Sequence, residues 1–176
     1  MKKIVSLLIL AVMCTALMAS CSSGEAHMGF QIVSTDINDF VLEAPQGWII
    51  TSQNGYACAK AEGYNGDESN ISATSFQMKE GLTTPEEYFE TAIVENFSEA
   101  HSMNVISRDV DCTLGEKNAK KYVYTLDMYG QTYKYQMVVC AYGSRIYVFT
   151  YTSTEEFYEL HELEVEYIVG YFGFKV

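Results

Sequence analysis

Basic residues are scarce in this chain, which has 11 Lys and Arg against 23 Asp and Glu. The phosphates of nucleic acids and anionic lipid headgroups repel a surface this acidic, which argues against nucleic-acid binding. An acidic surface also favours solubility, so by itself it gives little support to a cationic ligand or a metal.

The motifs of common catalytic and metal sites are also missing. No G-x-S-x-G, P-loop or G-x-G-x-x-G is present. The segment HELEV begins at His161 like the zinc-protease motif H-E-x-x-H, but Val165 stands where the second histidine is needed. We therefore expect His161 on a helix surface. The acidic segments 109–111 and 65–69 lack calcium-loop spacing and are expected to be solvated loops. The sequence predicts no catalytic residue, no cofactor and no metal site.

Cysteines are few, and no C-x-x-C pair occurs among them. Cys14 and Cys21 lie near the N-terminus, which leaves Cys58, Cys112 and Cys140 for the rest of the chain. Three thiols allow at most one disulfide, and the sequence leaves open whether any two of them pair. Lone cysteines in strand-like runs are usually small buried hydrophobes, and no histidine lies in an obvious partner segment, so a catalytic thiol is not expected.

The longest apolar run, residues 4–17, follows Lys2 and Lys3 and precedes Cys21 in LMASCSSG. It is too short for a comfortable membrane span of about 20 residues, and its flanks are typical of a signal peptide. The segment resembles a bacterial lipobox, in which the cysteine is diacylated and becomes the new N-terminus. This resemblance implies a signal peptide over residues 1–20, lipidation of Cys21, and attachment to the extracytoplasmic face of the cell membrane by acyl chains. A plain membrane anchor with an incidental cysteine is the alternative.

The rest of the chain is expected to form a short flexible tether, residues 21–29, and one domain, residues 30–176. This length is close to the typical size of a single domain. Without the signal peptide the chain keeps 9 basic and 23 acidic residues, a formal net charge of −14.

Strand patterns dominate both halves of this domain. The first half contains five short strand-like runs, with Asn54-Gly55 as a hairpin turn. The second half predicts a three-strand meander with turns at Tyr129-Gly130 and Gly143-Ser144. The last of its strands, Arg145–Thr152, is apolar on both faces and should be central and covered on both sides. The strands are expected within 30–34, 40–44, 48–52, 57–61, 70–78, 119–128, 131–142 and 145–152.

Two helices are predicted from capping signals. Thr84, Pro85 and Glu87 form a capping box with proline at the first helical position. The apolar stripe that follows, which includes Phe89 and Ile93, should lie across a sheet.

The second helix is expected to begin with a capping box of Ser153 and Glu156 and to end at Gly170. Its pattern places five residues near the face that covers the sheet: Phe157, Leu160, either Leu163 or Glu164, Tyr167 and Ile168.

Four segments in this order, FVLEAPQGW, TTPEEYF, RIYVFTYTSTEEFYE and YFGFKV, resemble the PsbP-like superfamily. The resemblance implies an α+β fold, an antiparallel sheet flanked by helices on both faces (an α/β/α sandwich), and no shared enzymatic activity. In that superfamily an element like that of Pro45, Gly47 and Trp48 turns the chain and buries the aromatic ring against the sheet. The same resemblance implies a bacterial lipoprotein.

The chain holds 14 tyrosines, many of them in the meander. Alternating tyrosines are what a half-buried sheet needs, so most are expected in the core or in cross-strand pairs. If a ligand face exists, the candidate interaction surface is formed by Tyr129, Tyr133 and Tyr135.

Two functions remain open. The first is a lipid-anchored, non-enzymatic binding or assembly module that docks a protein partner in the cell envelope. The second is a small-molecule-binding lipoprotein accessory to a transporter, with a cleft between sheet and helix. An exposed aromatic patch would favour the first, and a deep pocket with convergent polar groups would favour the second.

Overall fold

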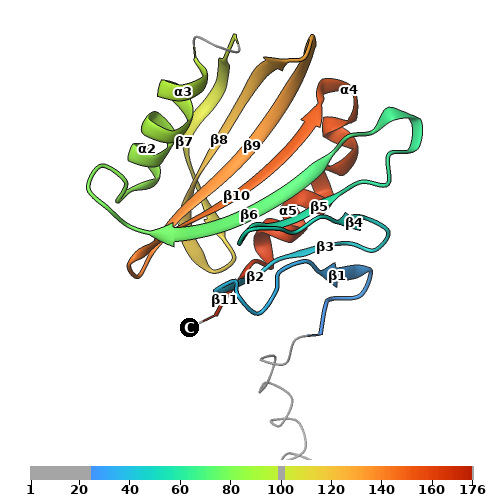
Figure 1. Cartoon of the computed structure of the whole chain (residues 1–176), viewed down its shortest axis with the longest axis horizontal. Helices are drawn as coiled ribbons and strands as arrows, with labels where there is room; N and C mark the ends of the chain where they lie inside the picture. Colours follow the sequence, from blue (N-terminus) through green and yellow to red (C-terminus); the bar gives the residue numbers. More distant parts are fainter. Residues whose placement is uncertain (1–24, 99–101, 176) are drawn as a thin grey trace, which may run out of the picture.

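The computed structural model describes residues 25–98 and 102–175 (Figure 1). The predicted signal peptide, residues 1–20, and Cys21 lie outside the described residues. A seven-stranded sheet forms the centre, and two small two-stranded sheets lie below it in the view of Figure 1. All strand pairs are antiparallel, which confirms the predicted α+β class. In spatial order the large sheet contains β4 (Ile49–Ile50), β5 (Ala57–Lys60), β6 (Asn70–Gln77), β10 (Arg145–Thr154), β9 (Gln131–Tyr142), β8 (Lys117–Met128) and β7 (Asn104–Leu114).

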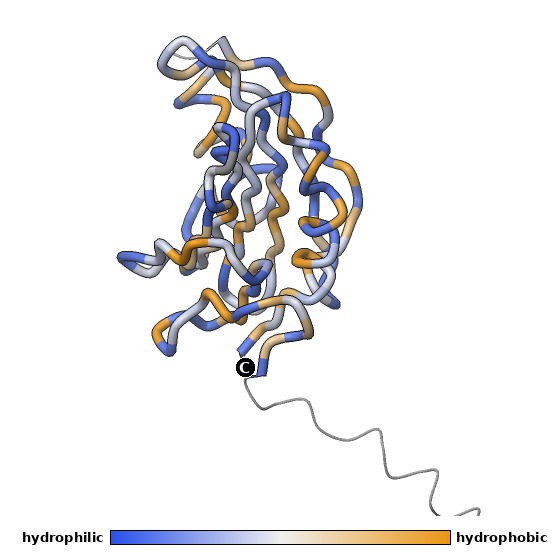
Figure 2. Tube along the Cα trace, turned by 90° about the vertical axis from the view of Figure 1, so that its right-hand side faces the viewer, coloured by the Kyte–Doolittle hydropathy of each residue, from blue (hydrophilic) through white to orange (hydrophobic). Residues whose placement is uncertain are grey.

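Strand β10 is the fourth of the seven strands and is apolar on both faces, as predicted. Its successive side chains alternate between two hydrophobic clusters because neighbours along a strand point to opposite faces. Ile146 and Val148 belong to one cluster, whereas Phe149 and Tyr151 belong to the other. Figure 2 shows apolar residues, in orange, recurring along the strands at the centre of the molecule and in the segments packed against them.

The cluster that contains Ile146 and Val148, called the first cluster below, includes residues of the helical segment 85–97. This segment is made of α2 (Pro85–Tyr88), η2 (Phe89–Val94) and α3 (Glu95–Phe97). The predicted capping box is present: the Glu87 backbone N–H donates to Thr84 Oγ1, and the Glu87 carboxylate accepts from the Thr84 backbone N–H. Phe89 and Ile93 face inward, and Phe89 stacks on Tyr122 with ring centroids 4.1 Å apart. The apolar stripe of this segment is therefore core, as expected.

The cluster that contains Phe149 and Tyr151, called the second cluster below, includes residues of the C-terminal helical stretch. This stretch is made of α4 (Glu155–Tyr158), η3 (Glu159–His161) and α5 (Glu162–Gly170). Val165 and Ile168 are fully buried in the second cluster, together with Phe40 and Leu42. The small sheets contribute to the same cluster; they pair β1 (Phe30–Ile32) with β3 (Glu43–Pro45), and β11 (Gly173–Phe174) with β2 (Phe40–Val41).

Two predictions about the C-terminal helix are wrong. The residue that precedes the helix is Thr154, and no side chain caps it; the Ser153 hydroxyl lies 2.8 Å from the Ser69 hydroxyl, so Ser153 and Glu156 form no capping box. Leu160 and Leu163 point away from the core, being 67% and 81% exposed. The 3₁₀ turn of η3 changes the helical period there, so spacing counted at 3.6 residues per turn misplaced these two leucines, whereas Ile168 of the same predicted face is buried.

The sequence also missed the edge strand β7. Val105, Ile106 and Val110 are exposed, and the one fully buried residue is Leu114 at the end of the strand, so β7 lacks the alternation that marks a half-buried strand. Register shifts at Val105/Ser107 and Ser107/Val110 interrupt it further. Asp109 and Asp111 therefore lie on a strand and not in the predicted solvated loop, and they pair with Arg108 and Lys120.

The predicted two-residue turns are confirmed. Asn54 and Gly55, and likewise Tyr129 and Gly130, all have positive φ, as the tight turn of a twisted hairpin requires. Contacts with the fold are present before Phe30, where the domain is predicted to start. The His27 backbone N–H, in the predicted tether, donates to the Glu43 carboxylate at 3.2 Å.

Replacing Phe89 by alanine tests the first cluster. Because Phe89 is fully buried against Tyr122, we expect Phe89→Ala to lower the free energy of unfolding by about 3–5 kcal/mol. Urea denaturation measures this. Thr91→Ala, on the exposed side of the same segment, is the control and should stay within about 0.5 kcal/mol of the parent. Equal small losses in both variants would contradict this packing.

Candidate functional site

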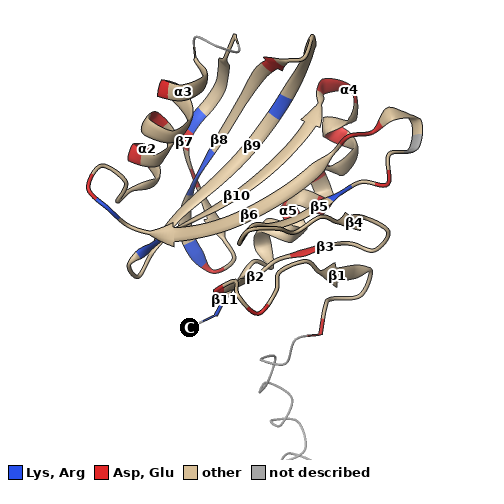
Figure 3. Cartoon of the chain, in the orientation of Figure 1, with Lys and Arg blue, Asp and Glu red and all other residues tan. Residues whose placement is uncertain are grey.

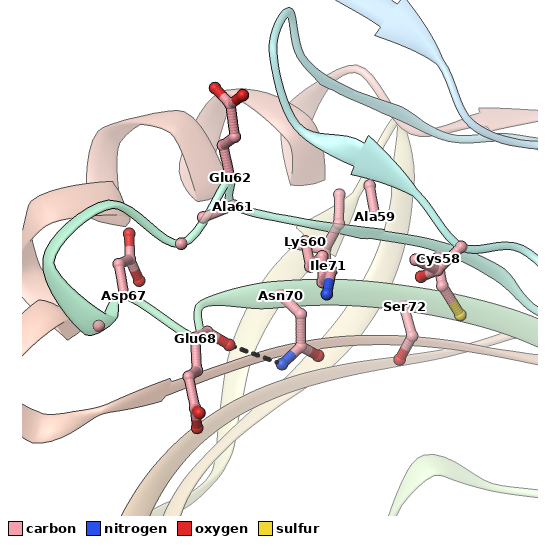
Figure 4. Close-up of a pocket in the computed structure, with 13 residues that line it drawn as sticks. Cys58, Ala59, Lys60, Ala61, Glu62, Asp67, Glu68, Asn70, Ile71 and Ser72 are labelled. Atoms are coloured by element: carbon pink, nitrogen blue, oxygen red, sulfur yellow. Dashed lines mark hydrogen bonds between the residues drawn. The ribbon is translucent and has the colours of Figure 1, made fainter.

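An open hollow of about 590 Å³ lies along β5, the start of β6 and the loop that joins them. That volume is in the range of small-ligand pockets. Figure 4 shows Cys58, Asn70 and Ser72 pointing to one side of these strands and Glu62 pointing to the other. The hollow is also lined by longer charged side chains, those of Lys60, Glu62 and Glu68.

The loop that forms one wall of the hollow is held by Asp67. The Ser69 backbone N–H donates to Asp67 Oδ1 at 2.9 Å, and Asp67 Oδ2 lies 2.8 Å from His161 Nε2 on the C-terminal helical stretch. The other ring nitrogen, Nδ1, lies 2.6 Å from Glu164 Oε2. One histidine therefore ties the loop to the helix through two carboxylates.

His161 is not the exposed helix residue that the sequence predicted. Its side chain is only 12% exposed, and Trp48 packs edge-on against it with ring centroids 5.1 Å apart. The 3₁₀ turn of η3 ends at His161, and its main partner Asp67 lies 94 residues away in the sequence. Because this contact joins distant parts of the chain, no local sequence pattern could have predicted it.

The two carboxylates decide the protonation of His161. Burial alone would lower the pKa of His161, but the hydrogen bonds to Asp67 and Glu164, and their charges, outweigh it and raise the pKa. For Asp67, burial acts to raise the pKa, and hydrogen bonds from Ser69 and His161 overcome it, so the pKa is lowered. Both shifts favour a charged pair.

These contacts make His161 a structural link. Both of its ring nitrogens face carboxylates, so neither is positioned to take a proton from a serine or cysteine. The buried hydroxyls of Ser69 and Ser153 bond each other. Burial raises the pKa of the Cys58 thiol, which disfavours the reactive thiolate.

The described residues, 25–98 and 102–175, give three further findings. Cys58, Cys112 and Cys140 are all free thiols. No group of three or more His, Cys, Asp or Glu side chains within these ranges is arranged to hold a metal ion. Every helix described is too short or too polar to span a bilayer.

The three tyrosines of the predicted interaction surface do not form one exposed patch. Tyr129 is 98% exposed at the tip of the β8–β9 hairpin, at the top of Figure 1. Tyr133 donates a hydrogen bond to Glu68 Oε2 at 2.7 Å. Tyr135 stacks on Tyr124 with ring centroids 5.0 Å apart and is partly buried. Of the other meander tyrosines, Tyr122, Tyr124, Tyr147 and Tyr151 are buried, as expected for core residues.

The segment that contains Pro45, Gly47 and Trp48 forms a tight turn at the end of β3. The Trp48 backbone N–H donates to the Pro45 carbonyl at 3.2 Å, and Gly47 has φ +94°, a conformation that favours glycine. Trp48 is 8% exposed and belongs to the second cluster. This turn places the ring beside His161.

No family model matches the sequence, and no curated protein is significantly similar to it. Solved structures do resemble the fold. The cyanobacterial PsbP protein CyanoP from Synechocystis sp. PCC 6803 has a TM-score of 0.60 at 13% identity, over 89% of this chain and 98% of that one. The Ran-binding protein Mog1p of Saccharomyces cerevisiae has a TM-score of 0.56 at 8% identity, over 85% and 97%. A Pseudomonas aeruginosa protein of unknown function, described as a putative regulator, has 0.57 at 15%, over 81% and 94%.

The chain therefore has the PsbP-like fold, as its sequence segments predicted. At these identities the similarity defines the fold alone.

The link between Asp67 and His161 predicts a pH-dependent stability. Because folding raises the pKa of His161, its contribution is complete below the ordinary histidine pKa of about 6.5 and is lost as the pH rises through the raised value. We expect the free energy of unfolding, measured with urea, to fall as the pH rises above the ordinary histidine pKa of about 6.5. His161→Gln and Asp67→Asn should each reduce this slope. An unchanged slope in both variants would contradict the assignment.

Proposed function

We propose that this chain is a lipid-anchored, extracytoplasmic binding module without enzymatic activity, which docks a protein partner in the cell envelope. The lipobox-like segment that ends at Cys21 supports the anchor and the location. The engagement of both His161 ring nitrogens by carboxylates supports a non-enzymatic role. We also infer a three-layered arrangement, in which segment 85–97 and the C-terminal helical stretch cover opposite faces of the sheet.

One observation carries the docking proposal: a tyrosine that is 98% exposed, at the tip of a tight hairpin. Tyr129 and Gly130 both have positive φ, and the Thr132 hydroxyl donates to Asp127 Oδ1 at 2.6 Å across the base of the turn. Below the tip, the Tyr135 hydroxyl contacts Met128 Sδ at 3.3 Å. The turn leaves the ring of Tyr129 without cover from its own chain.

Such a tyrosine suits a protein interface. Tyrosine offers a large amphipathic contact area and has few rotatable bonds, so fixing it in a complex costs little conformational entropy. Exposed aromatic anchors often supply much of the binding energy of an interface. Tyr133 and Tyr135, on the same strand, would border the contact. The fold comparison is compatible with this role, since Mog1p is described as a Ran-binding protein.

Site-specific photo-crosslinking in intact cells tests the proposal. We expect a benzophenone amino acid in place of Tyr129, in the full lipidated chain, to give one discrete adduct of higher mass. The same amino acid at Asn54, on the tip of another tight hairpin, is the control and should give none. Cys21→Ser should weaken the Tyr129 adduct by removing the anchor. No adduct, or the same adducts from both positions, would refute docking through this tip.

The second candidate function is that of a small-molecule-binding lipoprotein accessory to a transporter. The hollow of about 590 Å³ beside Asn70 and Ser72 is the observation that favours it. A small molecule that binds the folded domain raises its melting temperature, so this function predicts such a ligand in a thermal-shift screen. Docking through Tyr129 predicts no such ligand.

A further inference from the structure

The outer side of the C-terminal helical stretch, residues 155–170, carries two adjacent ridges that the fold leaves uncovered. Leucines at 160 and 163 form an apolar ridge and are 67% and 81% exposed. Beside it lies a row of exposed glutamates, the acidic ridge, in which Glu162 and Glu166 are four residues apart within α5 and so share one helix face. The acidic ridge consists of Glu155, Glu159, Glu162 and Glu166, all exposed.

The inner side of the same stretch is complete without these residues. Tyr158, Val165 and Ile168 are buried in the second cluster. The leucines therefore add nothing to the core, although each is a large apolar side chain. Exposed leucines side by side on a helix are typical of a contact surface.

The charge of the acidic ridge is not balanced by its own chain. Residues 155–170 contain no Lys or Arg, and His161 is turned inward toward Asp67. Within the described part of the chain, none of the four glutamates of the ridge forms an ion pair. Figure 3 shows acidic residues, in red, on α4 and no basic residue there.

This arrangement opposes helix stability. Like charges three or four residues apart repel each other along a helix. An acidic residue near the C-terminal end, such as Glu166, also opposes the helix dipole, because that end favours positive charge. Glu155 and Glu162 lie in the first turns of α4 and α5, where negative charge suits the helix dipole. The mutual repulsion and the position of Glu166 remain unfavourable, and no ion pair within the described residues offsets them.

We propose that this face binds a basic amphipathic helix of a second protein. The partner would place apolar side chains against Leu160 and Leu163, and lysine or arginine side chains against the acidic ridge, as charged positions flank an apolar seam in paired helices. Two leucines bury little area, so the contact is weak, and the charges make it fast and sensitive to salt. The contact is separate from the Tyr129 hairpin tip and does not depend on it.

The charge also argues against other occupants. A second copy of this chain would bring the same acidic face against itself in a two-fold pair, with repulsion across the contact. An anionic membrane surface would repel the acidic ridge in the same way. A positively charged helix is the occupant that complements both ridges.

Binding of a designed peptide tests this proposal. The protein is the chain from residue 21 with Cys21→Ser, which retains every described residue. The probe is a fluorescent amphipathic peptide of about 18 residues, with leucines on one face and lysines beside them. A second peptide has glutamine in place of every lysine. Fluorescence anisotropy at about 50 mM and about 300 mM NaCl measures the affinity.

Charge-matched variants separate a local contact from the general acidity of the chain. The triple variant Glu159→Gln, Glu162→Gln, Glu166→Gln changes the acidic ridge. Its control changes three exposed glutamates elsewhere by the same charge: Glu62→Gln, Glu80→Gln and Glu116→Gln. The double variant Leu160→Ser, Leu163→Ser removes the apolar ridge, and Tyr129→Ser leaves both ridges intact. Circular dichroism checks that each variant is folded.

We expect the lysine peptide to bind at least about tenfold more tightly than the glutamine peptide, and more weakly at high salt. The ridge triple variant and the leucine double variant should each weaken binding at least about tenfold, whereas the control triple variant and Tyr129→Ser should change it less than about twofold. No binding of the lysine peptide would overturn the proposal. So would equal losses in the two triple variants, or full binding by the leucine double variant.

Discussion

The burial of strand β10 on both faces is the constraint on which the rest of this structure depends. Ile146 and Phe149 are both fully buried, yet they belong to different hydrophobic clusters. A strand in this position is stable only when both of its faces are covered, because exposing either face would leave several large apolar side chains in water. Phe89 and Ile93 contribute to one cluster, and Val165 and Ile168 to the other, so each helical segment uses one face for packing.

Much of this fold follows from local patterns in the sequence. The capping box at Thr84, the positive-φ turns and the two-sided apolar pattern of β10 each depend on neighbouring residues, so they were predictable. Strand β7 was not, because an exposed edge strand with register shifts has no alternation. The burial of His161 was not predictable either, because it results from a 3₁₀ turn and from Asp67, which is distant in sequence. Of the candidate surface, only the exposure of Tyr129 matches what a turn sequence implies.

The proposed binding surfaces are the parts of the molecule that the packing does not use. The β8–β9 hairpin extends beyond the clusters and presents Tyr129, and the C-terminal helical stretch turns its acidic ridge and two leucines outward. Asp67 and His161 contribute differently, since they fix a loop to the helix and so keep both in place. In both proposals the sheet supports the surface, and the proposed contacts lie on a turn and on one helix face.

We propose above all that this domain is a binding module tethered to the membrane at Cys21. The most direct test is mass spectrometry of the N-terminal peptide of the protein purified from the membranes of cells that produce it. The account predicts a peptide that begins at Cys21, lacks residues 1–20 and carries the added mass of a diacylglycerol group. A peptide that retains residues 1–20, or one with an unmodified Cys21 thiol, would contradict it.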